Sequence, residues 1–375
     1  MPLHRFSFPT AIVFGPGAVQ ELPAECERRG LLRPLLVTDR GLRRTPVFDL
    51  VQKLLPNAII FDAVDPNPTE QNVADGVAAY RAAHSAAGCD SVIAVGGGSP
   101  LDAGKAIRLK VTHPLPLADY DDLIGGDAKI TRDLPPFIAL ATTSGTGSEV
   151  GRSAVITLKA TNRKTVIFSP FLIADLVLND PELTLGLPAA VTAGTGMDAL
   201  THNFEAYVAR GYHPICDGIG LAGVKLCAEH LPRLARNPQD LEARTGMMMA
   251  SMMGAIAFQM GLGATHSLAH PLSSEFAMHH GTANAVLLPA VIEFNSAVVA
   301  ERLAELSDIL GGPDSGTAVR RLNAMLGIAP RLRDYGVPEG ALEMLAAKAF
   351  EDGCHQLNPR PCSESDLLHL YRQAW

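Results

Sequence analysis

The sequence contains no run of lysines and arginines, and its formal net charge is −8. Proteins that bind nucleic acids neutralise phosphates with basic clusters, so this absence argues against a nucleic-acid surface. Charged residues make up 19% of the 375 residues and hydrophobic residues 47%, which is the balance of a folded chain rather than a disordered one. A chain of this length has room for two domains.

We also expect no disulfides, no signal peptide and no membrane span. The six cysteines form no C-x-x-C pair, and we expect isolated thiols in a reducing compartment. The N-terminal stretch MPLHRFSFPTAIVFG lacks the segments of a signal peptide, so we expect a cytoplasmic protein. Residues 246–274 carry no charge over a length that could span a bilayer, but Gln259, His266 and His270 would be costly in lipid. We therefore expect a buried helix there and no membrane partner.

The first half of the chain alternates between strand and helix patterns. Apolar runs at 31–39, 91–98 and 135–149 end in turn residues, and they are typical of strands buried on both faces of a parallel sheet. Between the first two, residues 69–88 place apolar side chains near helical spacing. This order of strand, helix and strand predicts an α/β layer architecture.

The pattern changes near residues 178–188, which are punctuated by proline and glycine. Beyond them strand patterns fade, and long stretches rich in alanine, leucine and methionine follow. We therefore predict an α/β domain over residues 1–180 and a helical domain over residues 181–375.

Three glycines and a serine, Gly96 to Ser99, directly follow the second apolar run. Glycines let a backbone approach phosphate closely, and a helix with Pro100 in its first turn would offer unpaired N–H groups. Asp102 would help to cap that helix. Neither the Walker A motif nor G-x-G-x-x-G is present, so a tight turn without a ligand is the alternative to the phosphate site that we favour.

Two further polar groups follow strand patterns. ATTSGTGSE, residues 141–149, is a second glycine-punctuated loop, and Asp39 ends the first apolar run. Open α/β sheets bind ligands at the carboxyl ends of their strands. Asp39 could accept both ribose hydroxyls of NAD, whereas Arg40 beside it could accommodate the 2′-phosphate of NADP. The residues alone leave this choice open.

Two pairs of potential metal ligands occur in the second half, one of an aspartate and a histidine and one of two histidines. Asp198 and His202 are four apart, as are His266 and His270, so each pair shares one helix face. An isolated charge on an apolar face is costly, and a divalent cation bound by both helices would compensate it. A set of histidines and a carboxylate suits Fe, Zn, Mn or Co. Spacing does not decide between His279 and His280 as a further ligand, and the zinc-peptidase motif H-E-x-x-H is absent.

Over nearly its whole length the chain resembles the iron-containing (group III) alcohol dehydrogenase family. The motifs that carry the resemblance are FGPGA (14–18), DPNPT (65–69), GGGSPLDAGKA (96–106), TTSGTGSEV (142–150), GMDALTHNFEAY (196–207), GLGATHSLAHPL (261–272), HGTANAVLLP (280–289) and NPRP (358–361). The resemblance implies an α/β dinucleotide-binding domain with a parallel, Rossmann-like sheet and flanking helices. An all-α domain follows, as in the dehydroquinate synthase-like architecture, with the active site in the cleft between the two.

The resemblance also assigns residues. It implies metal ligands at Asp198, His202, His266 and His280, and a proton relay at His270. The pyrophosphate site falls on the glycine loop, and Asp39 matches the ribose-binding acid of NAD-preferring members. Cys354 matches a position near the substrate pocket. The full set expected to bind the cofactor is Asp39, Asn67, Gly97, Gly98, Ser99, Asp102, Thr142, Thr143, Thr146 and Lys164.

Together these features predict a metal-dependent dehydrogenase that oxidises small alcohols, or reduces aldehydes, by hydride transfer. The cofactor is expected to be NAD, with NADP as the alternative, and the metal Fe(II), with Zn as the alternative. The metal would act as a Lewis acid while His270 carries the alcohol proton. The other functions considered are a glycerol-dehydrogenase-like polyol oxidoreductase, a dehydroquinate-synthase-like lyase, a phosphoester hydrolase and a silent binding module. A homodimer or larger homo-oligomer is expected from the family.

Overall fold

The computed structural model describes residues 10–83, 87–160 and 163–375. The chain divides into two compact units. One, the sheet unit, contains the described part of residues 10–143 together with Ser148–Gly186. The other, the helical unit, contains Leu187–Trp375 together with the short segment Ser144–Gly147.

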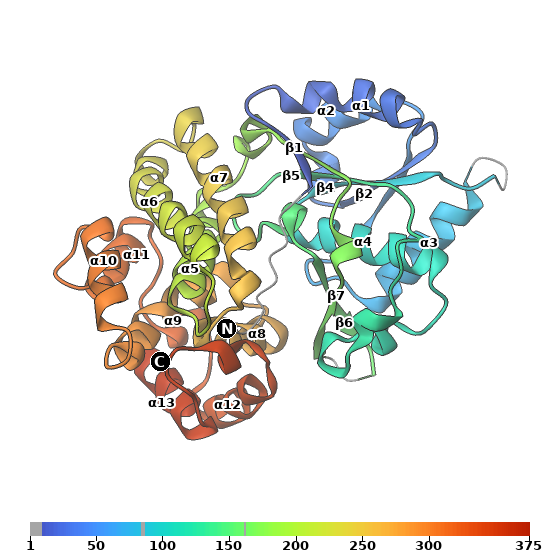
Figure 1. The fold of residues 1–375 in the computed structure, drawn as a ribbon. Coiled ribbons are helices and arrows are strands. Elements are labelled where there is room, and N and C mark those ends of the chain that lie inside the picture. Colours follow the sequence, from blue (N-terminus) through green and yellow to red (C-terminus); the bar gives the residue numbers. More distant parts are fainter. Residues whose placement is uncertain (1–9, 84–86, 161–162) are drawn as a thin grey trace. The chain divides into compact units, whose positions relative to one another are not determined.

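A six-stranded sheet forms the centre of the sheet unit (Figure 1). Every pair of neighbouring strands is parallel. The strands are, in spatial order, β1 (Ala11–Phe14), β8 (Leu176–Asn179), β5 (Phe137–Ala141), β4 (Ser91–Gly96), β2 (Pro34–Asp39) and β3 (Ile59–Val64). The parallel sheet predicted from the three apolar runs is thereby confirmed, because those runs contain β2, β4 and β5.

Helices cover both faces of this sheet (Figure 1). On one face α1 (Leu22–Arg29) and α2 (Pro46–Leu54) pack against buried strand side chains such as Ile93. On the other face lie α3 (Glu70–Ala82) and α4 (Gly98–Thr112). A Cβ at Gly104 of α4 would lie 2.9 Å from the Cβ of Ala94, so α4 presses closely on the sheet.

A two-stranded antiparallel sheet, β6 (Ser153–Leu158) and β7 (Arg163–Phe168), joins α4 through a buried lysine. The ammonium group of Lys105 is fully buried and donates to the carbonyl and the hydroxyl of Ser148 and to the carbonyl of Ser153. These three acceptors replace the water that burial removes. They fix the middle of α4 against the loop that follows β5 and against the first residue of β6.

The helical unit contains the long helices of the second half. They are α5 (Ala189–Val208), α6 (Pro214–Arg236), α7 (Leu241–Ala257), α8 (Ala264–Phe276), α9 (His280–Asn295), α10 (Ala300–Leu310), α11 (Ser315–Met325), α12 (Leu342–Glu351) and α13 (Glu364–Ala374). One hydrophobic core, with Leu200, Leu268 and Leu287 among its buried members, unites them. The expected helical second half is confirmed.

Two further expectations can be compared with the structure. Within the described residues, no helix combines the length and the apolarity that a membrane span needs. All six cysteines are free thiols, as their spacing predicts.

Candidate metal and catalytic site

The candidate metal site is built on three helices of the helical unit. Helix α5 carries Asp198 and His202 one turn apart, α8 carries His266, and α9 begins at His280. All except His280, which is partly exposed, are buried. The predicted helical spacing therefore holds, and tertiary packing brings the three helices together.

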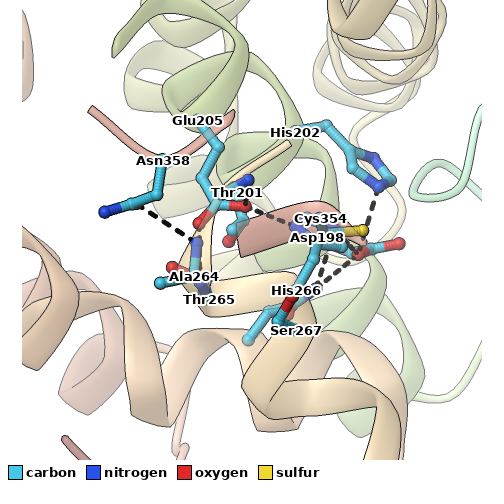
Figure 2. A network of polar contacts seen from close by, with 12 residues as sticks. Asp198, Thr201, His202, Glu205, Ala264, Thr265, His266, Ser267, Cys354 and Asn358 are labelled. Atoms are coloured by element: carbon cyan, nitrogen blue, oxygen red, sulfur yellow. Dashed lines mark hydrogen bonds and ion pairs between the residues drawn. The ribbon is translucent and has the colours of Figure 1, made fainter. Parts of the chain in front are cut away.

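Three imidazole nitrogens converge on one carboxylate oxygen, and Figure 2 shows two of these rings, His202 and His266, beside Asp198. Asp198 Oδ1 lies 3.8 Å from Nε2 of His202, 3.8 Å from Nε2 of His266 and 3.5 Å from Nε2 of His280. Donors that bind one metal tetrahedrally at about 2.1 Å are about 3.4 Å apart. Each of the three imidazole nitrogens therefore lies near this separation from Asp198 Oδ1, and the ligand atoms of Asp198, His202 and His266 all lie within 4.8 Å of one another.

The Nδ1 atoms of His202 and His266 contact oxygen atoms, so these two rings can offer Nε2 to a metal. His202 Nδ1 lies 3.2 Å from the carbonyl oxygen of Gly145, and His266 Nδ1 lies 2.6 Å from Oε2 of Glu205. Because each of these oxygens can only accept, each Nδ1 carries a proton, which leaves Nε2 as the nitrogen that can bind a metal. Burial acts to lower the pKa of His266, but the hydrogen bonds and charges of Asp198 and Glu205 outweigh it and raise this pKa to about 9. A divalent cation at Nε2 would take the place of that proton. The residues therefore fit a bound divalent metal.

Glu205 is a carboxylate that supports the site from behind. It is 2% exposed and accepts hydrogen bonds from the backbone N–H groups of Gly263 and Thr265 as well as from His266 (Figure 2). It therefore ties the first turn of α8 to α5. A carboxylate that orients a histidine in this way is a common partner of metal ligands in proteins.

Asn284 contacts the same donors from α9. Its Nδ2 donates to Asp198 Oδ1 at 2.8 Å and lies 3.3 Å from Nε2 of both His266 and His280. Burial acts to raise the pKa of Asp198, but the charges of His202 and His280 and the contact with His266 outweigh it and hold the pKa below its ordinary value. Burial lowers the pKa of His202 to about 4. An ionised carboxylate and a neutral imidazole are the forms that bind metals.

His270 and His279 lie beside this cluster. The ring of His270 stacks on that of His280 with centroids 5.2 Å apart, and its Nδ1 lies 2.8 Å from Oδ2 of Asp352. His279 is exposed and caps α9, where Nδ1 accepts from the backbone N–H of Thr282. The two histidines that spacing could not separate thus occupy different positions, and His280 is the one whose ring reaches Asp198.

The residues expected to bind the cofactor gather mostly at one edge of the sheet unit. Asp39 ends β2, the glycine loop follows β4, and Thr142 and Thr143 follow β5. Because these parallel strands are neighbours, their carboxyl ends share an edge, where open α/β sheets bind ligands. Asn67 follows β3, the next strand of the same edge.

The glycine loop has the geometry of a close approach. Gly96 has φ +154°, and a Cβ there would lie 2.5 Å from Pro100, so only glycine fits. Helix α4 starts at Gly98 with no side-chain cap at its N-terminus. The hydroxyl of Ser99 donates to the carbonyl of Pro66 and so ties α4 to the loop after β3. Uncapped N–H groups at a helix N-terminus are a general site for phosphate.

The expectation that Asp102 caps α4 is wrong. Its carboxylate accepts from the hydroxyl of Ser148 and from the backbone N–H of Val155, so it links α4 to β6. Burial raises its pKa, although the charges of Lys105 and Lys164 oppose this rise. Lys164, on β7, therefore lies near Asp102. Thr146 belongs to Ser144–Gly147, within the helical unit.

Three residues of the site were not singled out from the sequence. Glu205 lies seven residues after Asp198 on the same helix, and Asn284 lies four after His280, so helical spacing could have indicated both. Asp352 follows the end of α12 and is far in the chain from its partner His270. No pattern within a short stretch of the sequence predicts the contact between Asp352 and His270.

Both halves of this chain are similar in sequence to known proteins. Residues 9–181 match the iron-containing alcohol dehydrogenase family, and residues 192–375 match the C-terminal part of the Fe-containing alcohol dehydrogenase family. The 4-hydroxybutyrate dehydrogenase of Cupriavidus necator is 43% identical over 96% of each chain. The NAD-dependent methanol dehydrogenase of Bacillus methanolicus is 35% identical over 99% of this chain and 100% of its own. The solved structure of a 1,3-propanediol oxidoreductase superposes with a TM-score of 0.94 at 37% identity, over 99% of this chain and 100% of that one.

A parallel α/β sheet and a helical unit whose carboxylate and histidines could hold a metal ion are what the structure shows. With the two family matches, the assignment becomes specific: the chain belongs to the iron-containing alcohol dehydrogenase family. It is an alcohol dehydrogenase, an enzyme that interconverts alcohols with aldehydes or ketones, as the resemblance implies.

Proposed function

We propose that the protein is an NAD-linked dehydrogenase of small alcohols, which also works in reverse as an aldehyde reductase. The observation that carries this proposal is the convergence of three histidine Nε2 atoms on Asp198 Oδ1 at 3.5 to 3.8 Å. We further propose that Asp198, His202, His266 and His280 hold a divalent metal, with Fe(II) favoured over Zn. The family supports iron, whereas the donor types suit either metal.

The chemistry divides between the bound groups and the protein. A metal supplies Lewis-acid polarisation of an alcohol oxygen, and a nicotinamide ring supplies a hydride acceptor or donor. Oxidation also releases the hydroxyl proton. We assign its removal to His270, because this ring stacks on His280 and so lies at the edge of the proposed metal site. General base catalysis of this kind typically contributes about 10²- to 10⁴-fold.

The sheet unit supplies the proposed cofactor site. The uncapped N-terminus of α4 and the glycine loop would bind the pyrophosphate, and Asp39 would accept from the ribose hydroxyls. Thr142, Thr143, Thr146, Asn67 and Lys164 are proposed to line the rest of this site, together with Asp102. A relative described as NAD-dependent supports NAD as the cofactor. We also propose a homo-oligomer that resides in the cytoplasm, which light scattering and cell fractionation would test.

The test combines metal analysis with a substrate panel. Elemental analysis of purified protein should find about one divalent metal per chain. NADH should form from members of a panel containing methanol, 1,3-propanediol, 4-hydroxybutyrate and glycerol. Glycerol as the only good substrate would instead favour a polyol oxidoreductase. Absence of nicotinamide-linked activity with every alcohol and aldehyde would refute the proposal.

Two histidine variants separate binding from catalysis. His266→Ala removes a proposed ligand, so we expect it to lose both metal and turnover. His270→Ala removes the proposed base, so we expect it to keep the metal and lose about 10²-fold or more in kcat. Metal content by mass spectrometry and steady-state rates measure both effects. Equal metal content and equal activity in the two variants would contradict the proposed roles.

A further inference from the structure

Asp352 lies directly after α12 and has a fully organised set of hydrogen bonds. Its Oδ2 accepts from His270 Nδ1 at 2.8 Å. Its Oδ1 accepts from the hydroxyl of Ser267 at 2.7 Å and from the backbone N–H of Cys354 at 2.9 Å. Ser267 in turn accepts from the backbone N–H of His355 at 2.8 Å. The carboxylate is therefore fixed in place by groups that do not depend on His270.

This arrangement decides the tautomer of His270. A carboxylate only accepts hydrogen bonds, so Nδ1 carries a proton, and the tautomer that this contact selects has its lone pair at Nε2. The same ring stacks on His280 at 5.2 Å and meets His266 edge-on at 6.2 Å. An accepting nitrogen is thus held beside the proposed metal ligands. Without Asp352, either ring nitrogen could carry the proton.

We propose that Asp352 is a positioning residue for proton transfer in this enzyme. It holds His270 in the tautomer whose Nε2 accepts the alcohol proton, and its negative charge stabilises the imidazolium that forms. This inference rests on the proposed function of His270. In oxidation the alcohol O–H bond would break and its proton would pass to Nε2, while the carbinol C–H bond would break and a bound NAD⁺ would take up its hydride. The C=O bond forms, and the imidazolium then releases one proton to solvent.

A second metal site is the competing interpretation of the same residues. His270, Asp352 and Cys354 each offer a ligand atom, and these atoms lie within 4.8 Å of one another. The direct bond between His270 and Asp352 favours the dyad, because a metal would displace the proton that this bond shares. Burial, with the charge of Asp352, also raises the pKa of the Cys354 thiol well above its ordinary value, which disfavours the thiolate that metals bind.

The test uses the metal-loaded, full-length enzyme and the isosteric variant Asp352→Asn. We expect kcat to fall about 10²- to 10³-fold, because a wrong tautomer cannot accept the proton, while KM for the alcohol changes less than about threefold. Metal content should be unchanged. Asp352→Glu, which keeps a carboxylate, should recover most of the lost kcat. Asp314→Asn is the matched control, since Asp314 caps α11, where its carboxylate accepts from the backbone N–H and the hydroxyl of Thr317.

A spectroscopic readout separates positioning from mere stability. In zinc-loaded enzyme with ¹⁵N-labelled histidine, the signals that vanish in His270→Ala report the ring of His270. Its Nδ1 should appear protonated in the wild type and lose that proton in Asp352→Asn. The double variant should be no slower than His270→Ala, because Asp352 acts only through His270. If Asp352→Asn does not accumulate as folded protein, Asp352→Ser allows the same comparison.

The outcomes distinguish this inference from the function on which it rests. A wild-type enzyme without NAD-linked activity, or a fully active His270→Ala, would remove the proposed function and this inference together. Normal kcat in Asp352→Asn while His270→Ala is slow would overturn the inference alone. The inference would also be overturned if Asp352→Asn lowered kcat by the same factor in the wild type and in His270→Ala, because Asp352 would then act independently of His270. The loss of one of two bound metals in Asp352→Asn would establish the second metal site instead.

Discussion

At the scale of single residues, three histidines of the cluster are each oriented by a different partner. Gly145 accepts from His202, Glu205 accepts from His266, and Asp352 accepts from His270. Each partner engages Nδ1 and leaves Nε2 as the nitrogen that can bind a metal or a proton. The same side-chain type therefore serves as ligand or base according to what Nε2 faces.

Asp39 carries the prediction for cofactor choice. Its Oδ1 accepts from the backbone N–H groups of Gly41 and Leu42, so the turn after β2 holds the carboxylate at the carboxyl edge of the sheet. We expect Asp39→Gly to lower kcat/KM for NAD and raise it for NADP, shifting their ratio about tenfold or more, because the acid repels a 2′-phosphate. Steady-state kinetics with both cofactors measure the ratio.

Two companion variants interpret that result. Asp39→Asn keeps an acceptor for the turn and removes only the charge, so it should shift the ratio in the same direction. Asp49→Asn changes an exposed acid in the first turn of α2 and should leave the ratio unaltered. An unchanged ratio in both Asp39 variants would count against ribose binding by this residue.

Residue roles could be predicted from the sequence only where spacing within one element expresses them. Asp198 and His202 are one turn apart on α5, so their common face was readable. Asp352 and His270 meet from two distant elements, and no single-sequence pattern encodes that contact. Asp102 shows the opposite error, because its position near a helix start indicated a cap while tertiary structure offered Ser148 and Val155 instead.

At the scale of elements, the close contact between α5 and α9 sets the geometry of the cluster. A Cβ at Gly281 would lie 2.0 Å from the carbonyl oxygen of Gly194 and 2.9 Å from the Cβ of Asp198. Glycine at this position therefore lets the two helix backbones approach. That approach brings His280, the neighbour of Gly281, within 3.5 Å of Asp198.

Gly281→Ala tests this packing. The added methyl group must push α9 away from α5, so we expect the free energy of unfolding to fall by about 1–3 kcal/mol or more. Metal affinity should fall with it, because His280 moves away from Asp198. Denaturant unfolding and a chelator competition measure the two effects. Gly340→Ala is the matched control, since a Cβ there has no neighbour within 4 Å, and it should change neither quantity.

The elements themselves were predicted unevenly. The central strands β2, β4 and β5 are continuous apolar runs, which physical patterning makes visible. The edge strands β1 and β3 are more exposed and are marked less clearly by their composition. Strands β6 and β7 form a separate antiparallel sheet in which buried and more exposed side chains alternate. This short pair of strands was not predicted from the sequence.

At the scale of the whole molecule, the proposed metal links three helices of one unit. A ligand that binds only the folded state adds RT ln(1 + [L]/Kd), about 2.7 kcal/mol at 100 times Kd. Removal of the metal by a chelator should therefore lower Tm by roughly 5–11 °C for a unit of this size. Calorimetry with and without chelator measures the shift.

Hydrogen exchange shows which elements are destabilised when a chelator removes the metal. Exchange should accelerate in α5, α8 and α9 after chelation and stay unchanged in the strands of the sheet unit. The variant His266→Ala should show no response to the chelator, because it lacks the metal already. A Tm that is insensitive to chelator in a protein shown to contain metal would contradict a structural contribution of the ion.

The thiol of Cys354 lies beside Asp352 and is expected to react slowly with electrophiles. Aldehydes are electrophiles that react with thiolates, and the resemblance of this chain to its family implies that Cys354 lies near the substrate pocket. Burial and the neighbouring carboxylate of Asp352 raise the pKa of this thiol well above its ordinary value, so it stays protonated and poorly nucleophilic. With the proposed function, burial and the carboxylate that contacts His270 would together keep this thiol from adding to an aldehyde product.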